Sequence, residues 1–129
     1  MASVPLNEAP SDKALLRASD IAREYTMSSA RWQKALTPDF IAEWGRLTAN
    51  TAEPNPFYEC WHLRAALEAC DPEGTIEILQ FREDGQLRGL LPIERSNDYY
   101  GRPIPHLRGW LHDNAFCGVP LVARALTAK

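Results

Sequence analysis

The sequence predicts a mixed α/β (α+β) fold, in which a sheet built around a central β-hairpin carries two packed helices. Residues 75–95 show an apolar hairpin pattern around an Asp-Gly turn. Two helix starts precede it, and each has a capping residue followed by proline. At 129 residues and 45% hydrophobic, the chain has enough apolar material for one core.

The hairpin is the strongest of these patterns. Asp84-Gly85 favours positive φ, which suits a tight turn between two twisted strands. The apolar residues of its first arm are Ile76, Ile78, Leu79 and Phe81, and those of its second are Leu87, Leu90, Leu91 and Ile93. Because both arms are apolar on both faces, we expect both faces of the sheet to be covered.

The elements before the hairpin are a strand and two helices. Residues 24–32 suit a first strand. Thr37-Pro38-Asp39 starts a helix over 38–50, and its apolar positions are Phe40, Ile41, Trp44 and Leu47. A second helix starts at Asn55-Pro56 and ends before Asp71-Pro72, with apolar positions at Phe57, Trp61, Leu63, Leu67 and Cys70. We expect Trp44 and Trp61 to lie in the core.

The two ends of the chain carry weaker signals. Residues 1–24 are small and polar, which predicts a flexible extension before a domain over 25–129. After the hairpin, residues 96–105 form a loop and residues 106–111 a further strand. The tail beyond has no long period of its own.

Composition narrows the class of protein. The net charge of −3 and the mixing of acidic with basic residues argue against a nucleic-acid partner. Cys60, Cys70 and Cys117 form no even disulfide set and no metal-type pair, so reduced structural thiols are expected. No apolar run is long enough for a secretory core or a membrane span, and we expect a cytoplasmic protein.

Candidate site residues gather after the hairpin. His112-Asp113-Asn114 places an imidazole beside a carboxylate and an amide, a pattern that can orient a general base. Ordinary loop chemistry is the alternative, because neighbours on an extended segment point to opposite faces. Tyr99 is a candidate for the mouth of a pocket or for covering an edge, and Trp110 for a sugar-stacking platform or for core.

Cysteine and histidine are the other residue types here with reactive side chains. Cys117 follows His112 closely, but thiol packing is the alternative to a nucleophile. His62 is expected at the surface or its boundary, and the spacing of the three histidines matches no zinc motif.

The order strand, helix, helix, hairpin, strand resembles the N-terminal half of a GNAT-type N-acetyltransferase. The branch is the cellulose-biosynthesis-associated acetyltransferases, which are related to Fem-type aminoacyltransferases. The resemblance covers roughly residues 30–125 and rests on Trp44 and Leu47 before Pro56-Phe57 with Trp61, on Gly89-Leu90-Leu91-Pro92, and on the stretch His106 to Gly109. It implies acetyl-CoA or another acyl-CoA as co-substrate and a small-molecule or glycan-precursor acceptor.

The chain departs from that family on the donor side. GNAT enzymes hold the acyl-CoA pyrophosphate at a helix N-terminus that follows a glycine-containing loop. The candidate glycine segments here are 85–89, which belong to the hairpin, and Arg108-Gly109, which lacks a second glycine. We therefore expect no acyl-CoA binding by this chain alone. It is interpreted as a half-domain that needs a C-terminal half, with a degenerate stand-alone piece as the other option. A non-catalytic α/β module that pairs with a partner chain through an exposed sheet edge is the alternative function.

Overall fold

A computed structural model describes residues 23–113, 115 and 117–127. Most of the predicted extension, residues 1–22, and the predicted site residue Asn114 lie outside this part. The elements in chain order are β1 Tyr25–Arg31, α2 Trp32–Ala35, α3 Pro38–Ala49, the 3₁₀ turn η1 Pro56–Tyr58, α4 Cys60–Cys70, β2 Glu77–Glu83, β3 Gln86–Ser96, β4 His106–Gly109, β5 Leu121–Val122 and α5 Arg124–Thr127. The predicted α+β class is confirmed.

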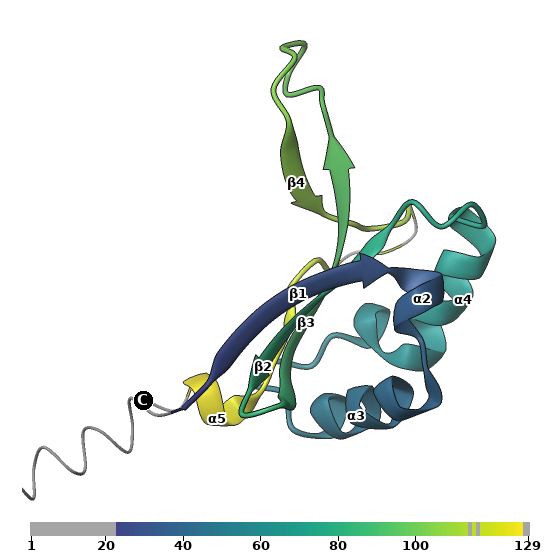
Figure 1. Ribbon diagram of the computed structural model, residues 1–129. Coiled ribbons are helices and arrows are strands. Elements are labelled where there is room, and N and C mark those ends of the chain that lie inside the picture. Colours follow the sequence, from purple (N-terminus) through teal and green to yellow (C-terminus); the bar gives the residue numbers. More distant parts are fainter. Residues whose placement is uncertain (1–22, 114, 116, 128–129) are drawn as a thin grey trace, which may run out of the picture.

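The strands form one antiparallel sheet in the order β1-β2-β3-β4, and β5 pairs with the other half of the same β3 edge. β4 faces residues Ile93 to Ser96, whereas β5 faces Gly89 and Leu90. The end of β3 and the start of β4 project beyond the rest of the sheet as an arm (Figure 1). Within the described ranges, no helix is long and apolar enough to cross a membrane.

The predicted hairpin is confirmed by β2 and β3. Asp84 and Gly85 take φ values of 50° and 78°, so both turn residues are left-handed as the Asp-Gly pair predicted. The pairing register shifts between Phe81 and Arg82, where β3 contributes one extra residue. Such a bulge bends and twists a strand.

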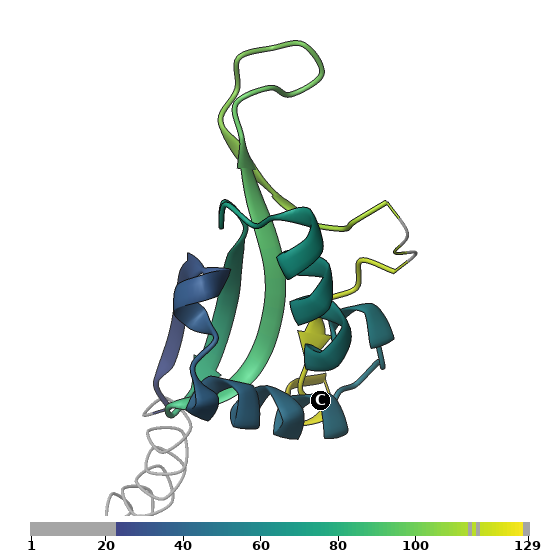
Figure 2. The same ribbon diagram turned by 90° about the vertical axis from the view of Figure 1, so that its right-hand side faces the viewer.

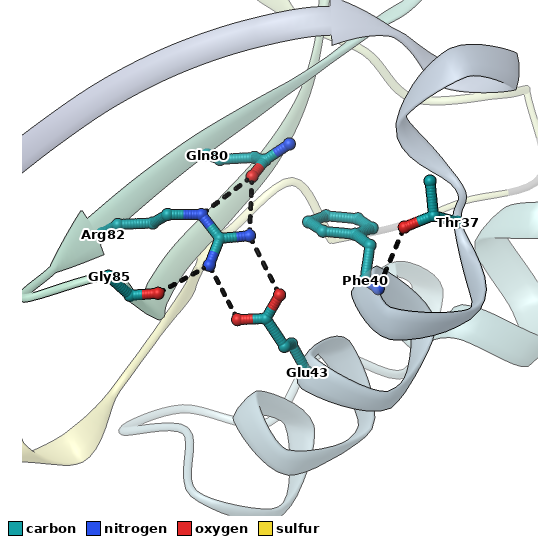
Figure 3. A network of polar contacts seen from close by, with 6 residues as sticks. All are labelled: Thr37, Phe40, Glu43, Gln80, Arg82 and Gly85. Carbon is teal, nitrogen blue, oxygen red and sulfur yellow. Dashed lines mark hydrogen bonds and ion pairs between the residues drawn. The ribbon is translucent and has the colours of Figure 1, made fainter.

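Arg82 links this hairpin to helix α3. Arg82 donates two hydrogen bonds to the Glu43 carboxylate of α3, with Nη1···Oε2 at 2.7 Å and Nη2···Oε1 at 3.0 Å (Figure 3). It also contacts the Gly85 carbonyl and the Gln80 side chain. The hydrogen bond from Arg82 holds the pKa of Glu43 below its ordinary value, so this carboxylate stays charged at neutral pH.

The helix α3 begins as the sequence predicted. The Thr37 hydroxyl accepts a hydrogen bond from the Phe40 amide at 3.2 Å (Figure 3), and Pro38 takes the first helical position. Its apolar face, formed by Phe40, Trp44 and Leu47, is buried. The Trp44 side chain is fully buried, which confirms its predicted place in the core.

The second helix differs from its prediction. Asn55 does cap the Phe57 amide, but only the short turn η1 follows, and the extended backbone of Glu59 separates it from α4. Leu63 and Leu67, two of the predicted apolar positions, are the buried residues of α4. Trp61 lies two residues from Leu63, on the opposite side of the helix, and is 69% exposed. Its predicted place in the core was wrong, and Cys70 is exposed as well.

Only one face of the sheet is covered by helices in the part of the chain that the structure describes. α3 and α4 lie on the same side of β2 and β3 (Figure 2). Cross-strand pairing places a set of apolar side chains on the other side, called here the outer face: Tyr25, Met27, Leu79, Phe81, Leu91 and Val122. Tyr25 and Met27 are 49% and 66% exposed. The expectation that both faces are covered is wrong for this part of the chain.

A buried carboxylate joins the end of α4 to the start of the sheet. Asp71 accepts hydrogen bonds from the Thr75 amide and hydroxyl, the Ile76 amide and the Trp32 indole. Burial of Asp71 acts to raise its pKa, but these hydrogen bonds together outweigh burial and lower the pKa from its ordinary value.

The two helix tryptophans should respond differently to truncation. Trp44→Ala removes a fully buried side chain and should cost about 3–5 kcal/mol of unfolding free energy. Trp61→Ala acts on an exposed side chain and should stay within about 0.5 kcal/mol. Urea denaturation of both variants measures the difference. A large loss in Trp61→Ala would show that the phase of α4 is as the sequence suggested.

Asp71→Asn should destabilise the chain by about 2–3 kcal/mol at pH 7, because the amide offers one acceptor oxygen where the carboxylate offers two. The folded pKa of Asp71 is lowered, so its ionised form stabilises the fold above the unfolded value of roughly 4, and this contribution is lost as pH falls further. The difference between wild type and variant should therefore shrink in acid. The exposed Asp98→Asn is the control, and a pH-independent difference would contradict the assignment.

Candidate functional site

The segment between β4 and β5, described at residues 110–113, 115 and 117–120, is held by Asn55, the cap of η1, and by Tyr58 within η1. The Asn55 side-chain amide, which is buried, donates to the carbonyls of Cys117 at 3.1 Å and Val119 at 2.8 Å. At the other end, the Tyr58 hydroxyl donates to the Trp110 carbonyl at 2.9 Å. The two polar side chains of the Asn-Pro-Phe-Tyr sequence thus position a segment more than fifty residues away.

The backbone of Tyr58 is held in turn by helix α3. The indole Nε1 of Trp44 in α3 donates to the Tyr58 carbonyl at 2.9 Å. Burial raises the pKa of the Tyr58 hydroxyl to about 12, so the phenol stays protonated and donates throughout the neutral range. A chain of buried hydrogen bonds therefore runs from α3 through η1 to the exit of β4.

This anchoring brings two histidines into contact. The Nε2 atoms of His62, in the first turn of α4, and His112 lie 3.0 Å apart. The ring centroids are 5.3 Å apart and the ring planes differ by 27°. Because the two nitrogens are much closer than the centroids, the rings meet edge to edge through Nε2. Both histidines are partly buried, so the contact is neither freely solvated nor deep in the core.

Aromatic side chains surround the pair. Phe57 and Trp61 each meet the His62 ring edge to face at a centroid distance of 5.3 Å. Trp110 lies 6.1 Å from the His112 ring. The exposed indole of Trp61 is held in place because its Nε1 donates to the Glu59 carboxylate at 2.6 Å. The three aromatic residues Phe57, Trp61 and Trp110, together with His62 and His112, are called here the histidine cluster.

The structure unites some of the predicted site residues and separates others. Trp110 and His112 are neighbours in the histidine cluster, while Asp113 is exposed beside it. Trp110 is only 9% exposed, which does not suit the sugar-stacking platform that was one of its two options. Tyr99 pairs instead with Arg102 in the turn between β3 and β4, against Tyr100 and His106, at the end of β4 that is remote from His112.

Three members of the histidine cluster, Phe57, Trp61 and His62, were not among the predicted site residues. His62 was expected only at a surface or boundary, and Trp61 was expected in the core. The signal that could have found them is the sequence Glu59 to His62, which places a carboxylate, an indole and an imidazole in one turn. Only the tertiary contact with His112 makes that turn distinctive.

Metal and thiol chemistry find little support at this site. Within the described residues, no group of three or more histidine, cysteine or acidic side chains could hold a metal ion. Burial raises the pKa of the Cys60 thiol, which works against a nucleophilic thiolate. Cys117 is half-buried, and its carbonyl is engaged by Asn55. The groups suited to chemistry are the two imidazoles, as proton acceptors or donors.

No known protein family, curated protein or solved structure matched the chain.

Tyr58→Phe tests how firmly the segment is held. The change removes the hydroxyl that bonds the Trp110 carbonyl and should cost about 1–2 kcal/mol of unfolding free energy. Tyr25→Phe is the matched control, because the Tyr25 ring is half-exposed on the outer face, and its cost should be close to zero. Equal effects of the two changes in chemical denaturation would contradict the anchoring role.

Proposed function

We propose that the chain is the N-terminal portion of an acyl-CoA-dependent N-acyltransferase and is inactive in the absence of the acyl-CoA-binding half. A role in exopolysaccharide or cell-envelope biosynthesis belongs to the same proposal and rests on the family resemblance alone. The observation that carries the half-domain assignment is the outer face. It is an apolar sheet surface that no described element covers.

An apolar surface of this kind favours a second polypeptide layer. Leu79, Phe81, Leu91 and Val122 line part of a hollow of about 200 Å³, and the Tyr25 ring stacks on Phe81 at a centroid distance of 5.8 Å. Contiguous exposed apolar patches mark interaction surfaces in most proteins. In the proposed enzyme, the polypeptide that binds acyl-CoA would pack against this face, opposite α3 and α4.

The acyltransferase assignment rests on the family resemblance and its order of elements. β1, α3, α4, the β2–β3 hairpin and β4 follow one another in the order that the resemblance rests on. In the proposed reaction, an acceptor amine or hydroxyl attacks the thioester carbonyl and must lose its proton. The histidine cluster supplies imidazoles for that step, and His112, Asp113 and Trp110 would lie near the acceptor, while the predicted site residue Asn114 lies outside the described residues. Tyr99 lies at the other end of β4, in the turn of the arm, and has no part in this step.

A non-catalytic interaction module is the second candidate, and the same outer face favours it. β1 adds a further reason, because it pairs only with β2 among the described strands and six of its seven residues are exposed. In this case the partner is another chain and no acyl donor is involved.

Calorimetry with acetyl-CoA and light scattering on the same sample distinguish the acyltransferase half-domain from the interaction module. The half-domain should give no binding heat and should aggregate without forming a defined oligomer, because its outer face is uncovered. Tyr25→Lys/Met27→Lys should remove that association, and Tyr99→Lys/Tyr100→Lys, at the exposed tip of the arm, should not. Micromolar binding would place the donor site in these residues and overturn the half-domain. A stable dimer that binds no acetyl-CoA would favour the interaction module.

Acyl transfer itself is tested by thiol release from acetyl-CoA, with amine and aminosugar acceptors. This assay uses the chain with whatever sequence its gene places beyond Lys129. Thiol release that depends on the acceptor supports the acyltransferase proposal. A folded protein that binds acetyl-CoA but releases no thiol would count against that proposal.

A further inference from the structure

The open edge of β1 presents backbone groups that no described element pairs. β1 is the border strand of the sheet, and β2 is its only neighbour among the described strands (Figure 1). We propose that this edge pairs with β1 of a second copy of the chain, antiparallel and in one register. The inference rests on the interaction module, the second candidate function, and names its partner. Edge pairing leaves the outer face of each copy uncovered, so the aggregation expected of the half-domain can build on paired chains.

Hydrogen bonds at the two ends of β1 show which of its backbone groups are free. The Asp84 amide bonds the Glu24 carbonyl at 2.8 Å, and the Trp32 amide bonds the Ile76 carbonyl at 3.0 Å. In an antiparallel ladder, residues that bond the neighbouring strand alternate with residues that face away from it. The register between β1 and β2 has no shift, so the even-numbered residues face β2. The odd-numbered residues therefore direct their N–H and C=O groups to the open edge: Tyr25, Met27, Ser29 and Arg31.

β1 lacks the features that usually prevent edge pairing. Its seven residues include no proline, lysine or acidic residue, and six of them are exposed. Its pairing with β2 contains no bulge. The other side of the sheet differs, because β4 and β5 cover the edge of β3. A long exposed edge without such protection is a template for another strand.

The positions of the free groups select one register for two copies of β1. Hydrogen bonds between the copies require odd-numbered residues to face odd-numbered residues. A twofold axis at Ser28 meets this requirement and uses the whole strand, because Tyr25 then faces Arg31 and Met27 faces Ser29 of the second copy. The two residues of each such pair exchange both of their backbone hydrogen bonds. Any shift of this register shortens the ladder.

The side chains that meet in this register are complementary. Arg31 is the only charged residue of β1, and the twofold axis keeps the two Arg31 side chains at opposite ends of the ladder. Each lies instead beside the half-exposed ring of Tyr25, which suits a cation–π contact. On the other side of that ring lies Glu83, the cross-strand partner of Tyr25 within the same chain. This self-complementarity identifies the occupant of the edge as a second copy.

Cysteine cross-linking tests the register. Across the axis, Ser28 faces Ser28 of the second copy in a non-hydrogen-bonded pair, where Cα atoms lie about 4.5 Å apart, within disulfide range. Ser28→Cys should therefore form a disulfide-linked dimer under mild oxidation. Thr26→Cys and Ala30→Cys should not do so alone, because these two positions face each other, but a mixture of the two variants should. Each variant also carries Cys70→Ser, because Cys70 is exposed, and non-reducing gels measure the yield against Cys70→Ser alone.

Ser29→Pro tests the hydrogen bonds of the pairing. The Ser29 N–H faces the open edge, so proline removes a donor between the copies and none from the ladder with β2. Ser29→Ala is the matched control, because it also loses the hydroxyl bond to Glu77 but keeps the N–H. In sedimentation experiments the dimer dissociation constant should rise at least about tenfold in Ser29→Pro and stay within about twofold in Ser29→Ala. Unchanged amide spectra identify variants that remain folded.

The outcomes separate the edge pairing from the proposed functions. Equal disulfide yields at Thr26, Ser28 and Ala30, or a chain that is only monomeric, would overturn the pairing. Undefined aggregates with no preference for Ser28 would do the same and would agree with the half-domain. A dimer that folded Ser29→Pro leaves intact would overturn the pairing and leave the interaction module with the outer face as its contact. A Ser28-linked dimer that binds acetyl-CoA would uphold the pairing and overturn the interaction module.

Discussion

The position of the candidate site depends on two buried hydrogen bonds of Tyr58, one at its carbonyl and one at its hydroxyl. Its carbonyl accepts from Trp44 and its hydroxyl donates to the Trp110 carbonyl. Both bonds are buried, where an unsatisfied polar group is costly, so the three elements they join have little freedom to separate. The position of His112 follows, because it lies two residues beyond Trp110. The chemistry of the candidate site is therefore a consequence of how η1 is packed.

The second constraint is the one-sided covering of the sheet. The helices bury the inner face through Trp44, Leu63 and Leu67, while the outer face keeps exposed apolar side chains. A stable folded layer and an uncovered surface thus coexist in the described part of the chain. This combination suits a unit that is completed by another polypeptide, and both candidate functions share that requirement.

The local parts of this structure could be predicted from the sequence. The hairpin followed from Asp84-Gly85 and the start of α3 from Thr37-Pro38, because turn and capping chemistry act over a few residues. Trp61 was misplaced because it lies two residues from Leu63, so one helix face cannot bury both side chains, and tertiary packing selects Leu63 and Leu67. The two-residue strand β5 carries no period of its own and is recognisable only against β3.

The candidate site was predicted only in part, for a related reason. His112 and Trp110 were found from their local pattern, but the contact with His62 spans fifty residues and is set by tertiary packing. Asn55 was recognised as a cap, whereas its hydrogen bonds to Cys117 and Val119 had no local signal. Patterns along the sequence identify residues with useful chemistry, and the fold decides which of them meet.

Native-state hydrogen exchange tests the central claim most directly, namely that η1 fixes the segment after β4. The Trp110 amide bonds the Pro92 carbonyl, and the Ala115 amide bonds the His112 carbonyl. If the anchoring holds, the Trp110 amide should open with nearly the same free energy as that of Ile78 in the core, and the Ala115 amide should also be protected. Near-random exchange at Trp110 and Ala115 beside a protected Ile78 would show that the segment is not held and that the histidine contact is not maintained.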